Sequence, residues 1–158
     1  MEGKNVSTRE NINAAMKDAL KNKEMERLAT IRLIIAAMKD KDINSRTEGR
    51  NDGIDESGVL SLLQSMIKQR KESAGIYREN NRPELADKEE FEIKTIEGFL
   101  PKQMSDDEVA KVIEDIIAST GAAGIKDMGK VMAELKAKYA GQLDMGKAGG
   151  VIKQKLSA

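Results

Sequence analysis

Two copies of the sequence Asp-Met-Gly-Lys lie near the carboxyl end of this 158-residue chain, at residues 127–130 and 144–147. The aspartates, Asp127 and Asp144, are helix-capping residue types, because a carboxylate accepts hydrogen bonds from the free N–H groups of a first turn. A helix start with free N–H groups, partial positive charge and a nearby ammonium is suited to anions. Two such starts side by side suit the phosphates of a nucleic acid backbone. The repeat therefore predicts a nucleic-acid interface.

The same repeat also has a purely structural explanation. Asp-x-Gly-Lys is an ordinary capping sequence, and two copies can mean only that two similar helices pack as a hairpin. Charge favours the nucleic-acid interpretation, since residues 121–158 carry a net charge of +4 and residues 105–120 carry −4. On a helical wheel Lys130, Lys147 and Lys153 lie away from the apolar stripes, where they are available to phosphates but equally normal on a solvated face.

A second basic cluster contains Lys68 and Lys71, which flank an apolar helical stripe. Lysines at such positions can contact phosphates, but they are equally normal on a solvated face, and both interpretations stay open. Arg70 differs, because at helical spacing it falls inside the apolar stripe. A buried guanidinium needs carboxylate partners, so we predict a structural ion pair from Arg70 to Glu89 or Glu92.

The residue types for most catalytic sites are missing from the chain. It has no cysteine and no histidine, which removes thiol nucleophiles, thiolate metal sites, disulfides and the commonest general base. No serine lies in a Gly-x-Ser-x-Gly turn, and no glycine-rich phosphate loop or dinucleotide fingerprint occurs. We therefore expect no catalytic residue, no metal and no cofactor.

The composition is that of a helix-rich protein, with 34% charged residues, 39% apolar residues and a formal net charge of zero. Aromatic residues make up only 3%, which argues against the stacking of single-stranded bases and favours contacts to structured RNA. The first residues lack an apolar leader core, and no apolar run approaches the length of a membrane span. These features predict a cytoplasmic protein without membrane contact.

Apolar residues recur at helical spacing through most of the chain, and no segment alternates as a strand does. The predicted helices cover residues 8–20, 24–44, 55–79, 83–99 and 105–120, with two shorter ones between residues 124 and 156. Ser7 and Ser105 begin capping boxes, and the polar segment 45–54 predicts a mobile surface loop. We expect an all-α fold, with an N-terminal antiparallel helical bundle at residues 1–100 and a three-helix tail domain at residues 101–158.

The motifs together resemble those of the GatB/YqeY family, and specifically of its small stand-alone YqeY-type members. The residues that carry the resemblance are Arg27-Leu28 with Ile31-Arg32, the run from Lys68 to Ser73, the run from Phe99 to Ser105, the run from Asp127 to Met132, and the run from Asp144 to Lys147. They are spread over nearly the whole chain in the family order. The chain departs from the family pattern at residues 80–85, where a glycine-rich link is usual.

The resemblance implies a helical N-terminal domain and a tail similar to the C-terminal domain of the B subunit of tRNA-dependent amidotransferases. In those enzymes the tail contacts tRNA, and other domains and subunits carry out the amide chemistry. By that analogy Lys126, Lys130 and Lys147 are the expected phosphate contacts in this chain. The family label is a carbon–nitrogen ligase with glutamine as amido donor, but the catalytic part has no counterpart in this chain. The implied function is thus a tRNA-binding accessory module, with a protein of tRNA aminoacylation or amidation as a second partner. The alternative is a helical protein-interaction scaffold with no nucleic-acid role.

Overall fold

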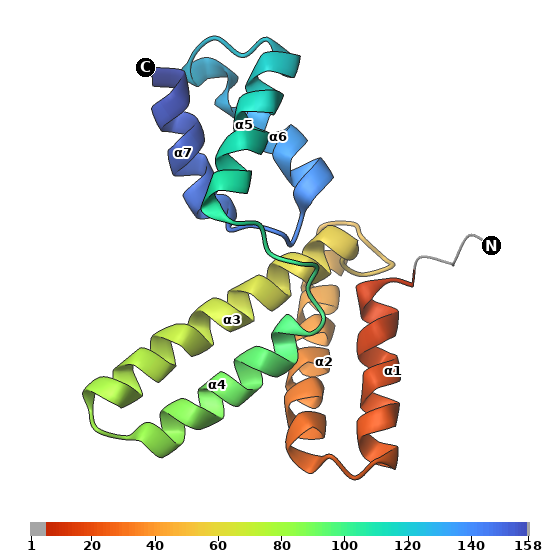
Figure 1. Ribbon diagram of the computed structural model, residues 1–158. Helices are drawn as coiled ribbons and strands as arrows, with labels where there is room; N and C mark the ends of the chain where they lie inside the picture. Colours follow the sequence, from red (N-terminus) through yellow and green to blue (C-terminus); the bar gives the residue numbers. More distant parts are fainter. Residues whose placement is uncertain (1–5, 158) are drawn as a thin grey trace, which may run out of the picture. The chain divides into compact units, whose positions relative to one another are not determined.

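Helices make up all the regular secondary structure of residues 6–157, the part of the chain that the computed structural model describes (Figure 1). The helices are α1 (Thr8–Lys21), α2 (Met25–Arg46), α3 (Glu56–Glu79), α4 (Pro83–Glu97), α5 (Asp106–Thr120), α6 (Met128–Tyr139) and α7 (Met145–Ser157), and the 3₁₀-helix η1 spans Ile125–Asp127. The prediction of an all-α fold is confirmed.

The chain divides into two compact units, Met1–Leu100 and Pro101–Ala158. Each unit has its own aliphatic core. In the first unit, fully buried side chains of α2, α3 and α4 meet, among them Ile31, Leu63 and Ile96. In the second, the core residues come from all three helices and from the segment between α6 and α7; among them are Ile113, Leu135, Leu143 and Ile152.

The first unit consists of two helical hairpins, α1 with α2 and α3 with α4 (Figure 1). The second hairpin turns sharply because Asn81 adopts a left-handed backbone conformation with φ of 58° and Pro83 opens α4. Proline suits a first helical turn, where its missing N–H group is not needed. Helix α2 packs against both α1 and α4 and so joins the two hairpins.

Arg70 of α3 lies between the two helices of the second hairpin. Its Nε donates to Glu92 Oε2 of α4 at 2.8 Å, and its Nη1 donates to the carbonyl of Met66 at 3.3 Å. The side chains of Arg70 and Glu92 are each only 14% exposed. Of the two acids proposed from the sequence, Glu92 is therefore the partner, and Glu89 forms no ion pair with any residue in the described part of the chain.

Arg9, at the start of α1, ties together the two ends of the polar segment that follows α2. Its guanidinium donates two hydrogen bonds to the Asp42 carboxylate, at 2.8 and 2.9 Å, and a third to the carbonyl of Ile54 at 3.2 Å. Asp42 also accepts from the N–H of Ile54 at 2.9 Å. The sequence suggested a loop from residue 45, but α2 continues to Arg46; Ser45 is buried, and its hydroxyl donates to the Asp42 carbonyl.

This clamp makes the stability of the first unit depend on pH. The hydrogen bonds from Arg9 hold the pKa of the Asp42 carboxyl below its ordinary value, against the opposing effect of burial. A carboxyl with a lowered pKa stabilises the fold above its unfolded-state pKa, and that stabilisation is lost as the pH falls through the folded-state pKa.

We expect the Asp42→Asn variant to lose about 2 kcal/mol at neutral pH, because hydrogen bonds to a charged group are the stronger ones. Urea unfolding of variant and wild type at a series of pH values measures the effect. The difference between the two proteins shrinks in acid, below the ordinary aspartate pKa of about 3.9. A difference that stays constant down to full protonation would contradict the assignment.

Candidate nucleic-acid interface

Both copies of the Asp-Met-Gly-Lys sequence begin helices, since α6 starts at Met128 and α7 at Met145. The two starts lie at opposite ends of the second unit. The N–H of Met104, just before α5, donates to the carbonyl of Gln142, just before α7, at 2.8 Å, so α5 and α7 start at the same end. Helix α6 starts at the other end, after the last turn of α5 (Figure 1). The prediction of two adjacent helix starts facing one anion is therefore wrong.

Asp127 does not cap α6 with its side chain. Its carboxylate instead accepts from the N–H of Ala123 at 3.0 Å, and this bond lowers its pKa. The preceding turn η1 also occupies the first N–H groups, because the N–H of Met128 bonds to the carbonyl of Ile125. The start of α6 thus lacks a side-chain cap, and the first N–H group of the helix is already bonded.

Asp144 does cap α7, and it satisfies the N–H groups that an anion would use. Its carboxylate accepts from the N–H of Gly146 at 2.8 Å and of Lys147 at 3.2 Å. The neighbouring start of α5 adds three acidic side chains in its first turn, residues 106–108, and is capped by the Ser105 hydroxyl. The negative charges of Asp144 and of residues 106–108 repel a further anion from the N-terminal ends of α5 and α7.

The outward face of α7 is different. The helix contains three lysines and no acidic residue. Lys155 is bound to Glu114 of α5 at 2.7 Å, whereas Lys147 and Lys153 are exposed and form no ion pair within residues 6–157. At about 100° per residue these two lysines lie on either side of a strip that contains Gly146 and Gly150.

The strip between the lysines has little side-chain cover. Gly146 and Gly150 are exposed; a Cβ added at Gly150 would meet no atom within 4 Å, whereas one added at Gly146 would lie 3.1 Å from Oδ1 of Asp144. The helix backbone is thus open to close approach at Gly150, with the ammonium groups of Lys147 and Lys153 on either side. We call this surface, made of Gly146, Lys147, Gly150 and Lys153, the α7 face.

The α7 face brings together only two of the lysines proposed from the sequence. Lys126 and Lys130 are exposed near the start of α6, at the other end of the unit. Lys68 and Lys71 are exposed on α3 in the first unit. Sequence reasoning missed the two glycines as site residues, although their spacing of four and the absence of acids from residues 145–157 were visible signals.

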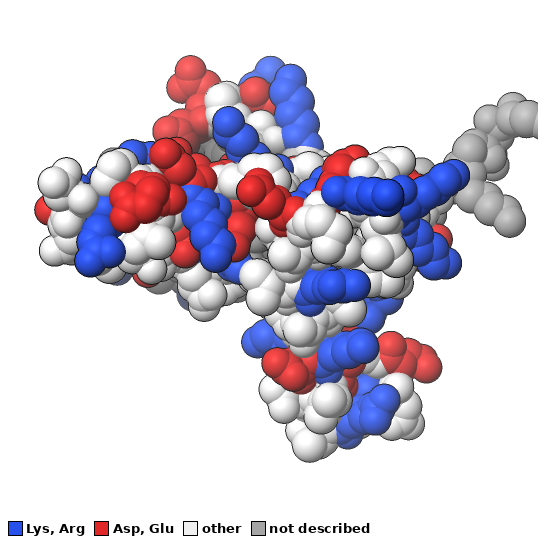
Figure 2. Space-filling model, turned by 90° about the horizontal axis from the view of Figure 1, so that it is seen from below, with Lys and Arg blue, Asp and Glu red and all other residues white. Residues whose placement is uncertain are grey.

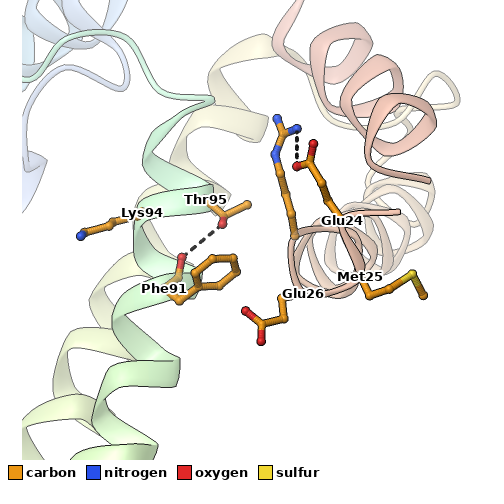
Figure 3. Close-up of a pocket in the computed structure, with 7 residues that line it drawn as sticks. Glu24, Met25, Glu26, Phe91, Lys94 and Thr95 are labelled. Carbon is orange, nitrogen blue, oxygen red and sulfur yellow. Dashed lines mark hydrogen bonds and ion pairs between the residues drawn. The ribbon is translucent and has the colours of Figure 1, made fainter. Parts of the chain in front are cut away.

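The first unit has a shallow groove of about 530 Å³ between the start of α2 and α4. Met25 and Phe91 provide apolar contacts there, and the ring of Phe91 points toward α2 whereas Lys94 points away (Figure 3). Arg27 and Glu24 at its edge form an ion pair of 3.5 Å. The residues that line the groove include neither a nucleophile–base pair nor a cluster of three carboxylates.

No large patch of one charge sign is seen on the face of the protein drawn in Figure 2. On the face drawn in Figure 2, basic and acidic side chains are interspersed with uncharged ones. Within residues 6–157 no group of three acidic, histidine or cysteine side chains is placed to hold a metal ion. No helix in the same part of the chain has the length and apolar character needed to cross a membrane.

The family described as Yqey-like protein matches residues 9–156. The chain belongs to this family. Among the YqeY-like relatives, "Altered inheritance of mitochondria protein 41, mitochondrial" from Vanderwaltozyma polyspora is 31% identical over 119 residues, which cover 72% of this chain and 62% of that protein. The protein of the same name from Kluyveromyces lactis is 30% identical, over 73% of this chain and 64% of its own length. An uncharacterized protein of Schizosaccharomyces pombe is 27% identical over 64% of this chain and 81% of its own length.

The chain therefore spans less than two thirds of the two mitochondrial proteins. Their names contradict the expectation of a cytoplasmic protein that was drawn from the sequence. That expectation rested on the lack of an apolar leader core. Such a core marks a secretory signal peptide. Mitochondrial transit segments are amphipathic and arginine-rich instead, so the test applied to the sequence could not detect them.

Proposed function

We propose that this YqeY-like protein binds the phosphate backbone of structured RNA through the α7 face. The observation that supports this most directly is that α7 itself contains no acidic residue and that its exposed Lys147 and Lys153 flank Gly150, where an added Cβ would meet no atom within 4 Å. Phosphate oxygens accept hydrogen bonds from ammonium groups, and a bare helix surface lets the sugar–phosphate chain come close. The α7 face replaces the paired helix starts as the physical basis of the proposed contact.

The proposed RNA is tRNA, by analogy with the tail domain of the amidotransferase B subunit. The shortage of aromatic side chains favours recognition by shape and phosphate contacts over base stacking. The protein then acts as an accessory module that holds tRNA for a partner of tRNA aminoacylation or amidation. No residue of the α7 face has the chemistry to transfer an amide group.

Replacement of Lys147 and Lys153 by alanine tests the proposal. We expect the affinity for labelled tRNA at low salt to fall about tenfold and the slope of log K against log salt to become shallower by about two, because two phosphate contacts are lost. Fluorescence anisotropy at a series of KCl concentrations measures both. The control removes the same charge from α6, as Lys136→Ala with Lys138→Ala, and leaves binding nearly unchanged.

A second variant separates close approach from charge. Gly150→Leu adds a side chain to the α7 face without a clash, since the position is open, and it replaces a poor helix former. We expect unchanged or higher stability and weaker tRNA binding. The matched control is Gly75→Leu on α3, which is equally open and lies in the other unit. Equal binding by all these variants, or no binding by the wild type at low salt, would reject the proposed function.

A further inference from the structure

Four residues of α7 surround Gly150 on the exposed side of the helix. At about 100° and about 1.5 Å per residue, Gly146 and Lys147 lie one turn before Gly150. Lys153 and Gln154 lie one turn after it. A strand that crosses the helix at Gly150 is therefore bordered by two ammonium groups, one uncharged polar side chain and one further glycine.

These four residues form two diagonals across the helix. Lys147 lies about 60° to one side of Gly150 and Lys153 about 60° to the other, with a rise of about 9 Å between them. On the second diagonal, Gln154 lies about 40° toward the side of Lys147. Its counterpart on the side of Lys153 is Gly146, which has no side chain. Of the four, only Gln154 thus adds an uncharged group that forms hydrogen bonds.

The side chain of Gln154 is free to meet a ligand. It is exposed, and its amide group forms no hydrogen bond within residues 6–157. The backbone carbonyl of Gln154 accepts from the hydroxyl of Ser157 at 3.2 Å, so the serine on the same side of the helix is bonded to the backbone. Helix α7 has no acidic residue that would compete for the N–H groups of the amide.

We infer that Gln154 contacts the 2′-hydroxyl of a ribose and so makes the α7 face selective for RNA over DNA. The inference rests on the proposed function, because it takes the phosphate contacts of Lys147 and Lys153 as given. A strand that crosses from one lysine to the other places a sugar between its phosphates, over Gly150, where the backbone is open. Gln154 lies beside that sugar, and its amide both donates and accepts, as a 2′-hydroxyl does.

The two lysines alone give no such selectivity. Ammonium groups contact the phosphates of RNA and DNA alike, and these contacts position a strand without distinguishing its chemistry. The 2′-hydroxyl is the group by which a protein distinguishes RNA from DNA at a given site. One hydrogen bond between uncharged groups corresponds to a difference of about fivefold in affinity.

Two labelled hairpins of the same sequence test the inference, one of RNA and one with fluorine in place of every 2′-hydroxyl. The fluorinated hairpin keeps the A-form helix and all phosphates, but its sugars have no hydroxyl donor. We expect the full chain to bind the RNA hairpin about fivefold more tightly in fluorescence anisotropy. This ratio should be the same at every KCl concentration, because both hairpins engage the same phosphates.

Gln154→Met keeps the length and the helix propensity of the side chain and removes its hydrogen-bonding groups. We expect this variant to bind both hairpins equally, and to bind the fluorinated one as tightly as the wild type does. The matched control is Gln69→Met on α3, an equally conservative change at an exposed position, which keeps the wild-type ratio. Circular dichroism should show an intact fold in both variants.

Equal binding of the two hairpins by the wild type would overturn the sugar contact and leave the phosphate contacts of the proposed function standing. The same holds if Gln154→Met keeps the fivefold preference for RNA. A wild type that binds neither hairpin at low salt rejects the proposed function and the sugar contact together. Loss of the preference in Gln154→Met but not in Gln69→Met identifies Gln154 as the residue that recognises ribose.

Discussion

Gly53→Ala should destabilise the first unit by about 3 kcal/mol, a large effect for the addition of one methyl group. Gly53 has φ of 85°, a left-handed conformation that is strained for alanine. The added Cβ would also lie 2.5 Å from Oδ1 of Asp42, closer than side-chain atoms pack. The carboxylate would have to move, and its hydrogen bonds to Arg9 and Ile54 would weaken.

Gly49→Ala is the matched control for this variant. Gly49 has nearly the same φ, 88°, in the same segment, but a Cβ there meets no atom within 4 Å. We expect this variant to lose only the conformational part, about 1 kcal/mol. Urea or thermal unfolding of both variants gives the difference, which measures the close packing of Gly53 on Asp42. Equal losses in the two variants would show that the contact contributes nothing.

The second large effect is expected at the ion pair between α3 and α4. Glu92→Leu alone should cost about 3 kcal/mol, because it leaves the Arg70 guanidinium mostly buried and without its partner. The double variant Arg70→Met with Glu92→Leu should recover to within about 1 kcal/mol of the wild type, since an apolar pair of similar size has no charge to desolvate. Chemical denaturation of the two single variants and the double variant gives the coupling energy.

The exposed pair between Arg78 and Glu90 joins the same two helices and serves as the control. Their side chains are 47% and 49% exposed, so the corresponding coupling should be below about 1 kcal/mol. A coupling between Arg70 and Glu92 no larger than this would mean that water reaches the inner pair freely.

Local signals in the sequence located most helix ends well. Ser7 and Ser105 each accept from the N–H three residues later, as capping boxes require, and Pro83 opens α4. Gly121 ends α5 in a left-handed conformation with φ of 69°. These ends depend on interactions within one turn, which neighbouring residues decide and a sequence therefore reveals.

The arrangement of the proposed site was harder to predict. The identity of the two Asp-Met-Gly-Lys copies suggested a shared function, but the short link at residues 140–144 makes α6 and α7 antiparallel and separates their starts. The bond from Ala123 to Asp127 depends on the turn η1, whose shape follows from packing rather than from a motif. Which side of α7 is exposed also depends on how the helix packs in the second unit. The α7 face could therefore not be located from the sequence.

The two cores share no residue, since one is built from residues 12–100 and the other from residues 104–156. Natural selection can therefore alter one without repacking the other. Changes on the surface of α7 leave the two hairpins of the first unit intact, and changes on the surface of α2 leave α7 as it is. Divergence within the family can thus proceed separately in the two halves of one polypeptide.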